Sequence, residues 1–255
     1  MINYTFIISI NVHEKPDFLL KQLDNIKNHI NYSYAVVLNC NNHMYKLLKD
    51  IVLPFNIYIN DNIIEKKRCT GTLAQGILSN IRYSIKNFNF DYFIILSSRT
   101  FFYNIININN LISQQIFCNE DIEEFKQTRA KSNDIEKLHT IYDMSYWKPF
   151  HFTSKLVEYY YNNNGLIYGS PHEGLTFTSN VAFNIINFLD NHKDIEDDIY
   201  KLNSPAEEFA LQTIAMNHIN EDNREYGFLD IGNGTDTQHV PPTVMNKYTY
   251  KVNRE

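Results

Sequence analysis

The first hundred residues alternate between short apolar runs and segments with helical periodicity. The apolar runs are rich in β-branched and aromatic residues, which favours buried strands, and they cover residues 4–10, 34–38, 57–59 and 92–96. Between them, helices are predicted from Pro16 to about residue 29, around residues 45–48, and from a Thr72 cap to about residue 86. Strands that alternate with helices in this way predict a parallel sheet with helices on its faces.

The rest of the chain continues the pattern less regularly. Polar and charged residues dominate positions 104–147, where we expect irregular structure with short helices. Helices are predicted over residues 153–161 and from a Ser179 cap to about residue 191, and strands over residues 175–178 and 226–231. No Pro/Gly/Ser-rich linker or charge block divides the 255 residues. We therefore predict a single α/β domain with a mixed, mostly parallel, Rossmann-like sheet flanked by helices.

A further helix is predicted to begin at Ser204, and its first turn contains the main candidate for a catalytic residue. Ser204 is followed by Pro205 and, three residues after the cap, by Glu207, which is the pattern of a capping box. Glu208 is left over in the first turn, where the helix dipole favours an ionised carboxylate suited to a general base. A solvated first-turn acid is the alternative interpretation of Glu208. The helix is expected to bury a stripe formed by Ala206, Phe209, Ala210, Thr213 and Ile214.

Composition and charge narrow the classes of partner. The net charge is -6, the pI is near 5.8, and lysines and arginines are scattered among acids, so there is no basic footprint for a nucleic acid. Three widely spaced cysteines, Cys40, Cys69 and Cys118, argue against a disulfide framework and for a reducing compartment. The N-terminus lacks the pattern of a signal peptide, and no apolar run approaches the roughly twenty residues of a membrane span. We therefore expect a soluble, cytoplasmic protein.

Polar residues follow the first three predicted strands, at positions 11–14, 39–42 and 60–62. In open sheets of this kind, ligands bind beyond the carboxyl ends of the strands. The sequence therefore predicts a ligand site along this edge of the sheet.

Three segments resemble a known family in the same order along the chain. They are residues 68–86 followed by Asp91-Tyr-Phe-Ile-Ile-Leu-Ser-Ser-Arg-Thr-Phe101, then Glu173-Gly-Leu-Thr-Phe-Thr-Ser179, then Ser204-Pro-Ala-Glu-Glu-Phe-Ala-Leu-Gln-Thr-Ile214. Together they resemble the core-2/I-branching β-1,6-N-acetylglucosaminyltransferases and the related peptide xylosyltransferases. In that family a strand ending in Leu-Cys/Ser-Gly-x-Asp-Phe-Pro precedes a Ser-Pro-Asp-Glu helix start.

The resemblance implies a GT-A-type fold and an inverting transfer of N-acetylglucosamine or xylose from a UDP-sugar to a glycan hydroxyl. Residues 1–100 would form the nucleotide-sugar half, and residues 101–255 the acceptor and catalytic half. Glu208 aligns with the family's catalytic base, and Glu207 replaces the preceding Asp. Inversion by direct displacement needs one such carboxylate and no covalent nucleophile. The family works without a metal, so basic residues near the C-terminus would stabilise the diphosphate, here Lys247, Lys251 and Arg254.

The resemblance also suggests which residues meet each substrate. The donor nucleotide would contact residues after the first strands and beside the third: Val12, His13, Asn39, Asn41, Arg68 and Thr70. The acceptor would contact Ser98, Arg99, Trp147, His172 and Glu173, of which Glu173 is a competing base. Two positions depart from the family: the second strand does not end in His-x-Asp, and Ser98-Arg-Thr100 replaces Gly-x-Asp, so Thr100 cannot supply a carboxylate.

Two other functions are compatible with the sequence. A metal-dependent glycosyl- or nucleotidyltransferase of the same fold class would use Asp61, within Asn60-Asp61-Asn62, to bind a divalent cation. This segment is otherwise an ordinary polar turn. A catalytically inactive glycan-binding module would explain the missing family Asp at Thr100. Nucleotide binding and its metal dependence discriminate among the three functions.

Overall fold

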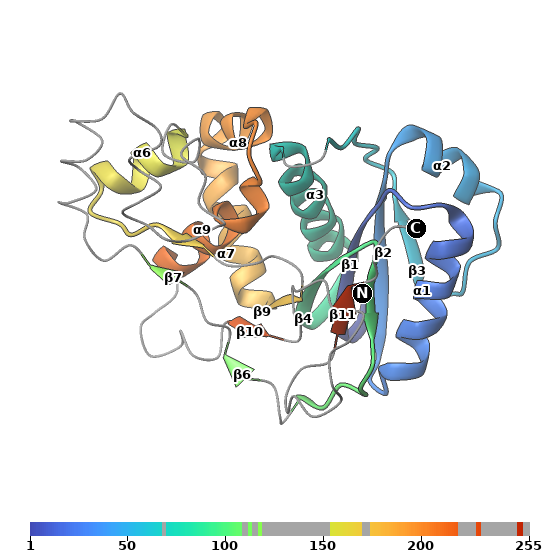
Figure 1. The fold of residues 1–255 in the computed structure, drawn as a ribbon. Coiled ribbons are helices and arrows are strands. Elements are labelled where there is room, and N and C mark those ends of the chain that lie inside the picture. The colour runs from blue at the N-terminus through green and yellow to red at the C-terminus, as the bar shows by residue number, and fades with distance from the viewer. Residues whose placement is uncertain are drawn as a thin grey trace.

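The computed structural model describes residues 1–67, 70–108, 154–169 and 174–218, together with the backbone of four short strands at 112–113, 117–118, 228–230 and 249–251. These residues form an α/β fold around one mixed sheet (Figure 1). The order of strands in the sheet is β3-β2-β1-β4-β9-β10-β6. Their bounds are β1 Ile2–Val12, β2 Tyr34–Cys40, β3 Ile57–Asn60, β4 Phe88–Ser97, β6 Ile112–Ser113, β9 Leu175–Thr178 and β10 Phe228–Asp230.

The sheet is parallel over its first four strands. β1 pairs in parallel with β2 on one side and with β4 on the other, and β2 pairs in parallel with β3. β9 joins β4 in the antiparallel sense, and β10 and β6 extend the sheet from there. The prediction of a mixed, mostly parallel, Rossmann-like sheet flanked by helices is confirmed.

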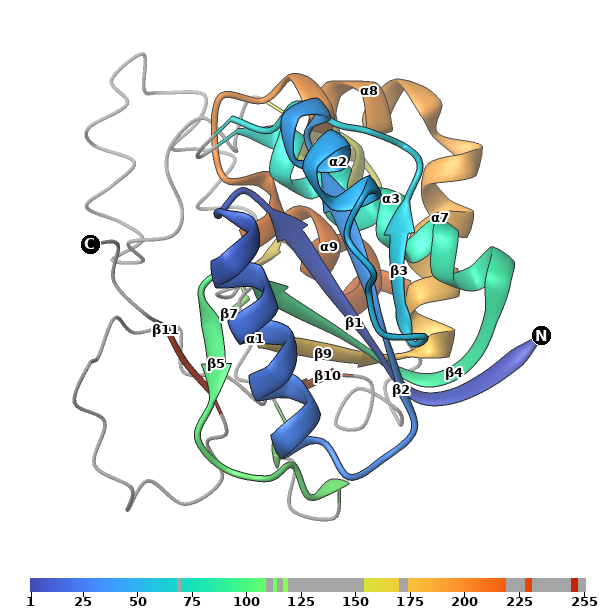
Figure 2. The ribbon, with the colours of Figure 1, turned by 90° about the vertical axis from the view of Figure 1, so that its right-hand side faces the viewer.

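Helices cover both faces of the sheet. Their bounds are α1 Pro16–His29, α2 Asn42–Lys49, α3 Gly71–Asn87, α6 Lys155–Asn162, α7 Ser179–Asn191, α8 Lys193–Lys201 and α9 Ala210–His218. Apolar side chains of α1 and α2 form one buried cluster with one face of β1 and β2, and those of α3, α7 and α9 form a second cluster on the other face. Figure 2 shows α1 and α3 on opposite sides of β1. The core is therefore two apolar layers separated by the sheet.

Two small sheets lie outside this layered core. The first pairs β5, Thr100–Phe102, with β11, Thr249–Lys251, and the second pairs β7, Phe117–Cys118, with β8, Tyr168–Gly169. β5 follows β4 after a short turn, so the first of these ladders lies next to the carboxyl end of β4. It brings a distant part of the sequence to the edge where a ligand is expected.

Within the described residues the predicted elements are present, but several boundaries differ; the short helices expected over residues 104–147 lie largely outside those residues. The helix from Pro16 and the strand over residues 175–178 are confirmed at the predicted bounds. β1 continues to Val12 because Asn11 and Val12 still pair with Asn39 and Cys40 of β2, which the polarity of Asn11 concealed. Two predicted caps are wrong. α3 begins at Gly71, before Thr72, and α7 already includes Ser179 as its first residue.

Gly71 begins α3 against the backbone of α8. The Gly71 N–H donates to the carbonyl of Leu202 at 2.8 Å, and a Cβ at this position would lie 1.7 Å from the carbonyl oxygen of Ile199. We expect Gly71→Ala to lower the free energy of unfolding by about 2 kcal/mol, because the two helices must separate. Gly76→Ala should cost less, since its Cβ would meet the movable side chains of Asn11 and Lys66. Urea denaturation of both variants tests this; equal losses would contradict it.

Candidate functional site

The carboxyl ends of β1 and β4 lie at a reversal of the strand order. From β1 the chain passes through α1 to β2 on one side, whereas α3 leads back to β4 on the other side. Ligands of open α/β sheets bind beyond the carboxyl ends of the strands, at such a reversal of the strand order. The structure places the predicted residues Val12, His13, Asn39, Asn41, Ser98 and Arg99 along this carboxyl edge.

Two amide side chains line the ends of β1 and β2. Asn11 donates from Nδ2 to the carbonyl of Leu73 at 2.9 Å, and Asn39 donates from Nδ2 to the carbonyl of Asn62, also at 2.9 Å. Neither Oδ1 atom accepts a hydrogen bond from any described residue, although both atoms are buried. Unsatisfied buried acceptors are uncommon and call for a reason. The carboxyl edge therefore holds two buried amide oxygens without a hydrogen-bond donor among the described residues.

Several of the other predicted residues have structural roles. Val12 is 1% exposed and belongs to the apolar cluster under α1, so its side chain is part of the core. His13 is exposed immediately after β1. Asn41 caps α2, because its Oδ1 accepts from the Met44 N–H at 2.8 Å. Thr70 stands before α3 and donates from Oγ1 to the carbonyl of Lys67 at 3.0 Å.

A tight turn after β4 presents Arg99 at the same edge. Gln22 of α1 donates from Nε2 to the carbonyls of both Ser97 and Thr100 at 2.8 Å, which fixes the turn. Ser98 is almost fully buried, and its Oγ has no hydrogen bond to a described residue. The Arg99 Nε lies 4.0 Å from Glu14 Oε1, across the ends of β4 and β1. The Arg99 guanidinium therefore lies beside the carboxyl ends of β1 and β4.

Lys66 is a candidate that the sequence interpretation missed. Its ammonium donates to the carbonyl of Ile64 at 3.2 Å, and its side chain reaches the space beside Gly76 where Asn11 also lies. Burial lowers the pKa of Lys66 to about 8, although the charges of Cys40 and Glu65 act in the opposite direction. The run Lys66-Lys-Arg68 marked the segment as basic, but nothing in the sequence distinguished the one lysine that packs into the edge.

Glu208 lies in a 3-10 turn, η3 Ala206–Glu208, rather than in the first turn of an α-helix. The predicted capping box is wrong: the hydroxyl of Ser204 is buried without a hydrogen bond to a described residue, and its carbonyl accepts from the Ala206 N–H at 2.8 Å. α9 begins only at Ala210. The predicted stripe is confirmed, since Ala206, Phe209, Ala210, Thr213 and Ile214 are all buried. Glu207 is buried as well, whereas Glu208 is half-exposed.

The turn that carries Glu208 packs on the N-terminal part of α3. Residues of η3 and α3 are in contact, and Leu202, just before η3, accepts from the Gly71 N–H. The next turn of α3 is tied to the end of β1 through the Asn11–Leu73 hydrogen bond. A chain of direct contacts therefore connects the Glu208 turn to the carboxyl edge of the sheet.

The C-terminal strand reaches the other side of this edge. β11 pairs with β5 in the antiparallel sense, and the backbone of Lys251 lies opposite Thr100. Thr100 directly follows Arg99 in the turn after β4. The remaining predicted residues lie outside the described ones: Arg68, Trp147, His172, Glu173, Lys247 and Arg254.

Asp61 is exposed after β3, between Asn60 and Asn62. Within the part of the chain that the structure describes, no three His, Cys, Asp or Glu side chains gather closely enough to hold a metal ion. In the same residues, no helix is long and apolar enough to cross a membrane.

Comparison with known proteins adds no family assignment. No protein-family model matches the chain, and no curated protein matches it with significant sequence similarity.

Proposed function

We propose that the chain is an inverting glycosyltransferase that moves N-acetylglucosamine or xylose from a UDP-sugar to a glycan hydroxyl without a metal ion. The pairing of β11 with β5 is the observation that carries this proposal. It brings the backbone of Lys251, one of the basic C-terminal residues named from the sequence, opposite Thr100 and next to Arg99. This pairing supports a role for the basic C-terminal residues in stabilising the charge of a leaving nucleotide.

The donor nucleotide fits the carboxyl edge by its chemistry. The uracil and ribose of a UDP-sugar offer N–H and O–H donors, which suit the unsatisfied amide oxygens of Asn11 and Asn39. The diphosphate is anionic, which suits Arg99 and Lys66 at the same edge. An amide pair beside two cations favours a nucleotide diphosphate over a neutral metabolite.

Transfer would proceed by direct displacement. The Glu208 carboxylate takes the proton of an acceptor hydroxyl while the hydroxyl oxygen forms a bond to the anomeric carbon of the donor sugar. The bond from that carbon to the diphosphate oxygen breaks at the same time, and the electron pair leaves with UDP. Arg99, Lys66 and the basic C-terminal residues stabilise the negative charge that develops on the leaving diphosphate.

We place the protein in the cytoplasm. Cys40 is a buried free thiol, and burial raises its pKa to about 11, so it is an unreactive core residue. Together with the odd number of cysteines, this supports a reducing compartment. The acceptor would then be a glycan assembled inside the cell.

A thermal-shift and calorimetric panel of UDP, GDP, CMP and UDP-sugars, each with manganese or with chelator, tests the proposed function. UDP and one UDP-sugar are expected to raise the melting temperature selectively, because a ligand that binds only the folded state stabilises it by mass action. The shift should survive chelator. Binding that requires manganese would move the assignment to an Asp61-dependent enzyme, and an absence of nucleotide binding would contradict transfer altogether.

A further inference from the structure

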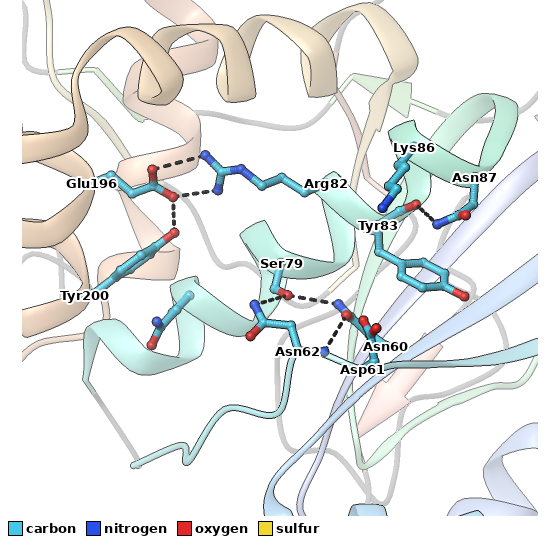
Figure 3. Close-up of a pocket in the computed structure, with 11 residues that line it drawn as sticks. Asn60, Asp61, Asn62, Ser79, Arg82, Tyr83, Lys86, Asn87, Glu196 and Tyr200 are labelled. Carbon is cyan, nitrogen blue, oxygen red and sulfur yellow. Dashed lines mark hydrogen bonds and ion pairs between the residues drawn. The ribbon is translucent and has the colours of Figure 1, made fainter.

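A cavity of about 500 Å³ lies between α3, α8 and the end of β3, apart from the residues assigned to the donor (Figure 3). This volume is within the roughly 300–1,000 Å³ of small-molecule sites. Four side-chain amides, from Asn60, Asn62, Gln75 and Asn87, contribute to its lining together with the phenol of Tyr83. Such a lining offers many hydrogen-bond donors and acceptors and little apolar surface.

Positively and negatively charged side chains around the cavity offset one another. Arg82 is held by Glu196, with Nη1–Oε1 at 2.5 Å, and by Asp190, with Nη2–Oδ1 at 2.8 Å. Figure 3 shows this guanidinium directed at Glu196 and Tyr200 of α8. The two remaining charged groups of the lining, Asp61 and Lys86, are of opposite sign. The cavity therefore has no excess of positive charge for a phosphate or of negative charge for a cation.

The amide of Asn62 is held in place by buried neighbours. Asn60, 2% exposed, donates to Ser79 Oγ at 2.9 Å and to Asn80 Oδ1 at 3.0 Å, and its own Oδ1 accepts from the Asn62 N–H at 3.1 Å. Asn62 then donates from Nδ2 to Ser79 Oγ at 2.9 Å. Figure 3 shows this group gathered at the end of β3 against α3. The Oδ1 of Asn62 is left oriented and available to a ligand.

Two further groups of the lining are available. The Gln75 side chain and the Asp61 carboxylate make no hydrogen bond to any described residue, and Gln75 is half-buried. Burial and then the charge of Asp61 raise the pKa of Tyr83, which lines the same cavity. A carboxylate, two amides and a phenol with an aromatic face match the alternating hydroxyl groups and C–H surface of a sugar ring.

We propose that this cavity binds a neutral sugar unit of a glycan. The site is distinct from the proposed transfer site, because its lining comes from α3, α8 and the end of β3 and includes neither Arg99 nor Glu208. Resting on the proposed function, it would hold a remote unit of the acceptor while another unit reacts. Binding in two places would increase the apparent affinity for a branched or extended acceptor.

Saturation-transfer NMR and calorimetry with neutral mono- and disaccharides of N-acetylglucosamine, galactose and xylose test the site. Asp61→Ala/Gln75→Ala should weaken saccharide binding at least tenfold, since both side chains leave the cavity while the core is untouched. Asp17→Ala/Asn28→Ala is the matched control: both residues are exposed on α1, on the opposite face of the sheet, and the change should leave binding intact.

The nucleotide panel is repeated on the same proteins to separate the two proposals. Saccharide binding lost in the cavity variant, with UDP binding unchanged, supports the site. No saturable saccharide binding by the wild-type protein, or equal binding by the cavity variant, overturns it whatever UDP does. Loss of UDP binding in the cavity variant also overturns it, because the cavity would then belong to the nucleotide. Saccharide binding without any UDP binding keeps the sugar site and refutes the transferase.

Discussion

Glu208→Gln is expected to lower the rate of sugar transfer by about 10²–10⁴-fold and to leave the affinity for UDP unchanged. Glutamine keeps the size and hydrogen-bonding shape of the side chain but cannot accept the proton of the acceptor hydroxyl. Glu208 is half-exposed in η3, so the substitution should not disturb the buried stripe beside it. Loss of the rate with unchanged donor binding is what the removal of a general base produces.

The measurement is UDP release from the donor sugar that binds in the nucleotide panel, with a set of oligosaccharide acceptors. Glu158→Gln is the control, because Glu158 is an exposed acid in the first turn of α6 and has no role in the proposed chemistry. Unchanged turnover in Glu208→Gln would refute the assignment of the base. An equal decrease in both variants would point to a general effect on folding.

Arg82→Met is expected to lower the free energy of unfolding by about 3 kcal/mol at about pH 7. Glu196 is 5% exposed and accepts from both terminal nitrogens of Arg82, at 2.5 and 3.1 Å. Methionine retains the apolar part of the side chain and removes the charge. Among the described residues, the buried carboxylate would then keep Lys193 and the Tyr200 hydroxyl as its side-chain partners.

The loss in Arg82→Met should shrink in acid. Burial alone would raise the pKa of Glu196, but hydrogen bonds from Tyr200, Arg82 and Lys193 outweigh it, so the folded-state pKa lies below the ordinary value of 4.5. A carboxyl group with a lowered folded-state pKa stabilises the protein above its unfolded pKa, and this contribution is lost as the pH falls through the folded-state value. Urea denaturation of wild type and variant from about pH 7 down to about pH 3.5 measures the difference.

Lys155→Met provides the matched control for this experiment. Lys155 pairs with Asp194 at 3.2 Å, but their side chains are 52% and 67% exposed, so solvent screens the pair. Its loss should leave the free energy of unfolding almost unchanged. A loss in Arg82→Met that is no larger than in Lys155→Met, or that does not change with pH, would contradict the structural role of the buried network.

The helices and strands of the core were predictable because the apolar positions in their sequences are the positions that are buried in the structure. The strand over residues 175–178 and the helix from Pro16 show this directly. α8 was missed because Lys193–Lys201 is mostly charged and buries only Ile195, Glu196 and Ile199. Ser204 shows the opposite failure. Its local pattern matches a capping box, but packing buries the serine and turns the chain into a 3-10 conformation before α9. Tertiary packing decided both outcomes.

The position of the candidate site was predictable, but its charged groups were only partly so. The rule that ligands bind beyond parallel strand ends pointed to Asn39, which lies at the carboxyl edge, and Arg99, named from the family resemblance, lies after β4 at the same edge. It could not show that Val12 is buried or that Asn41 is used to cap α2. The Lys66 side chain packs at the carboxyl edge beside Gly76, where a Cβ would collide with it. This contact joins two elements in space and could not be recognised from the sequence.

The ladder between β5 and β11 has a consequence for the order of assembly during synthesis. Its strands are roughly 150 residues apart in the sequence, so they make one of the least local contacts in the fold. β1 to β4 leave the ribosome much earlier, and their parallel pairs join residues at most 86 positions apart, as for Ile2 and Phe88. We therefore expect the sheet to form first and the β5–β11 ladder beside Arg99 to be completed last.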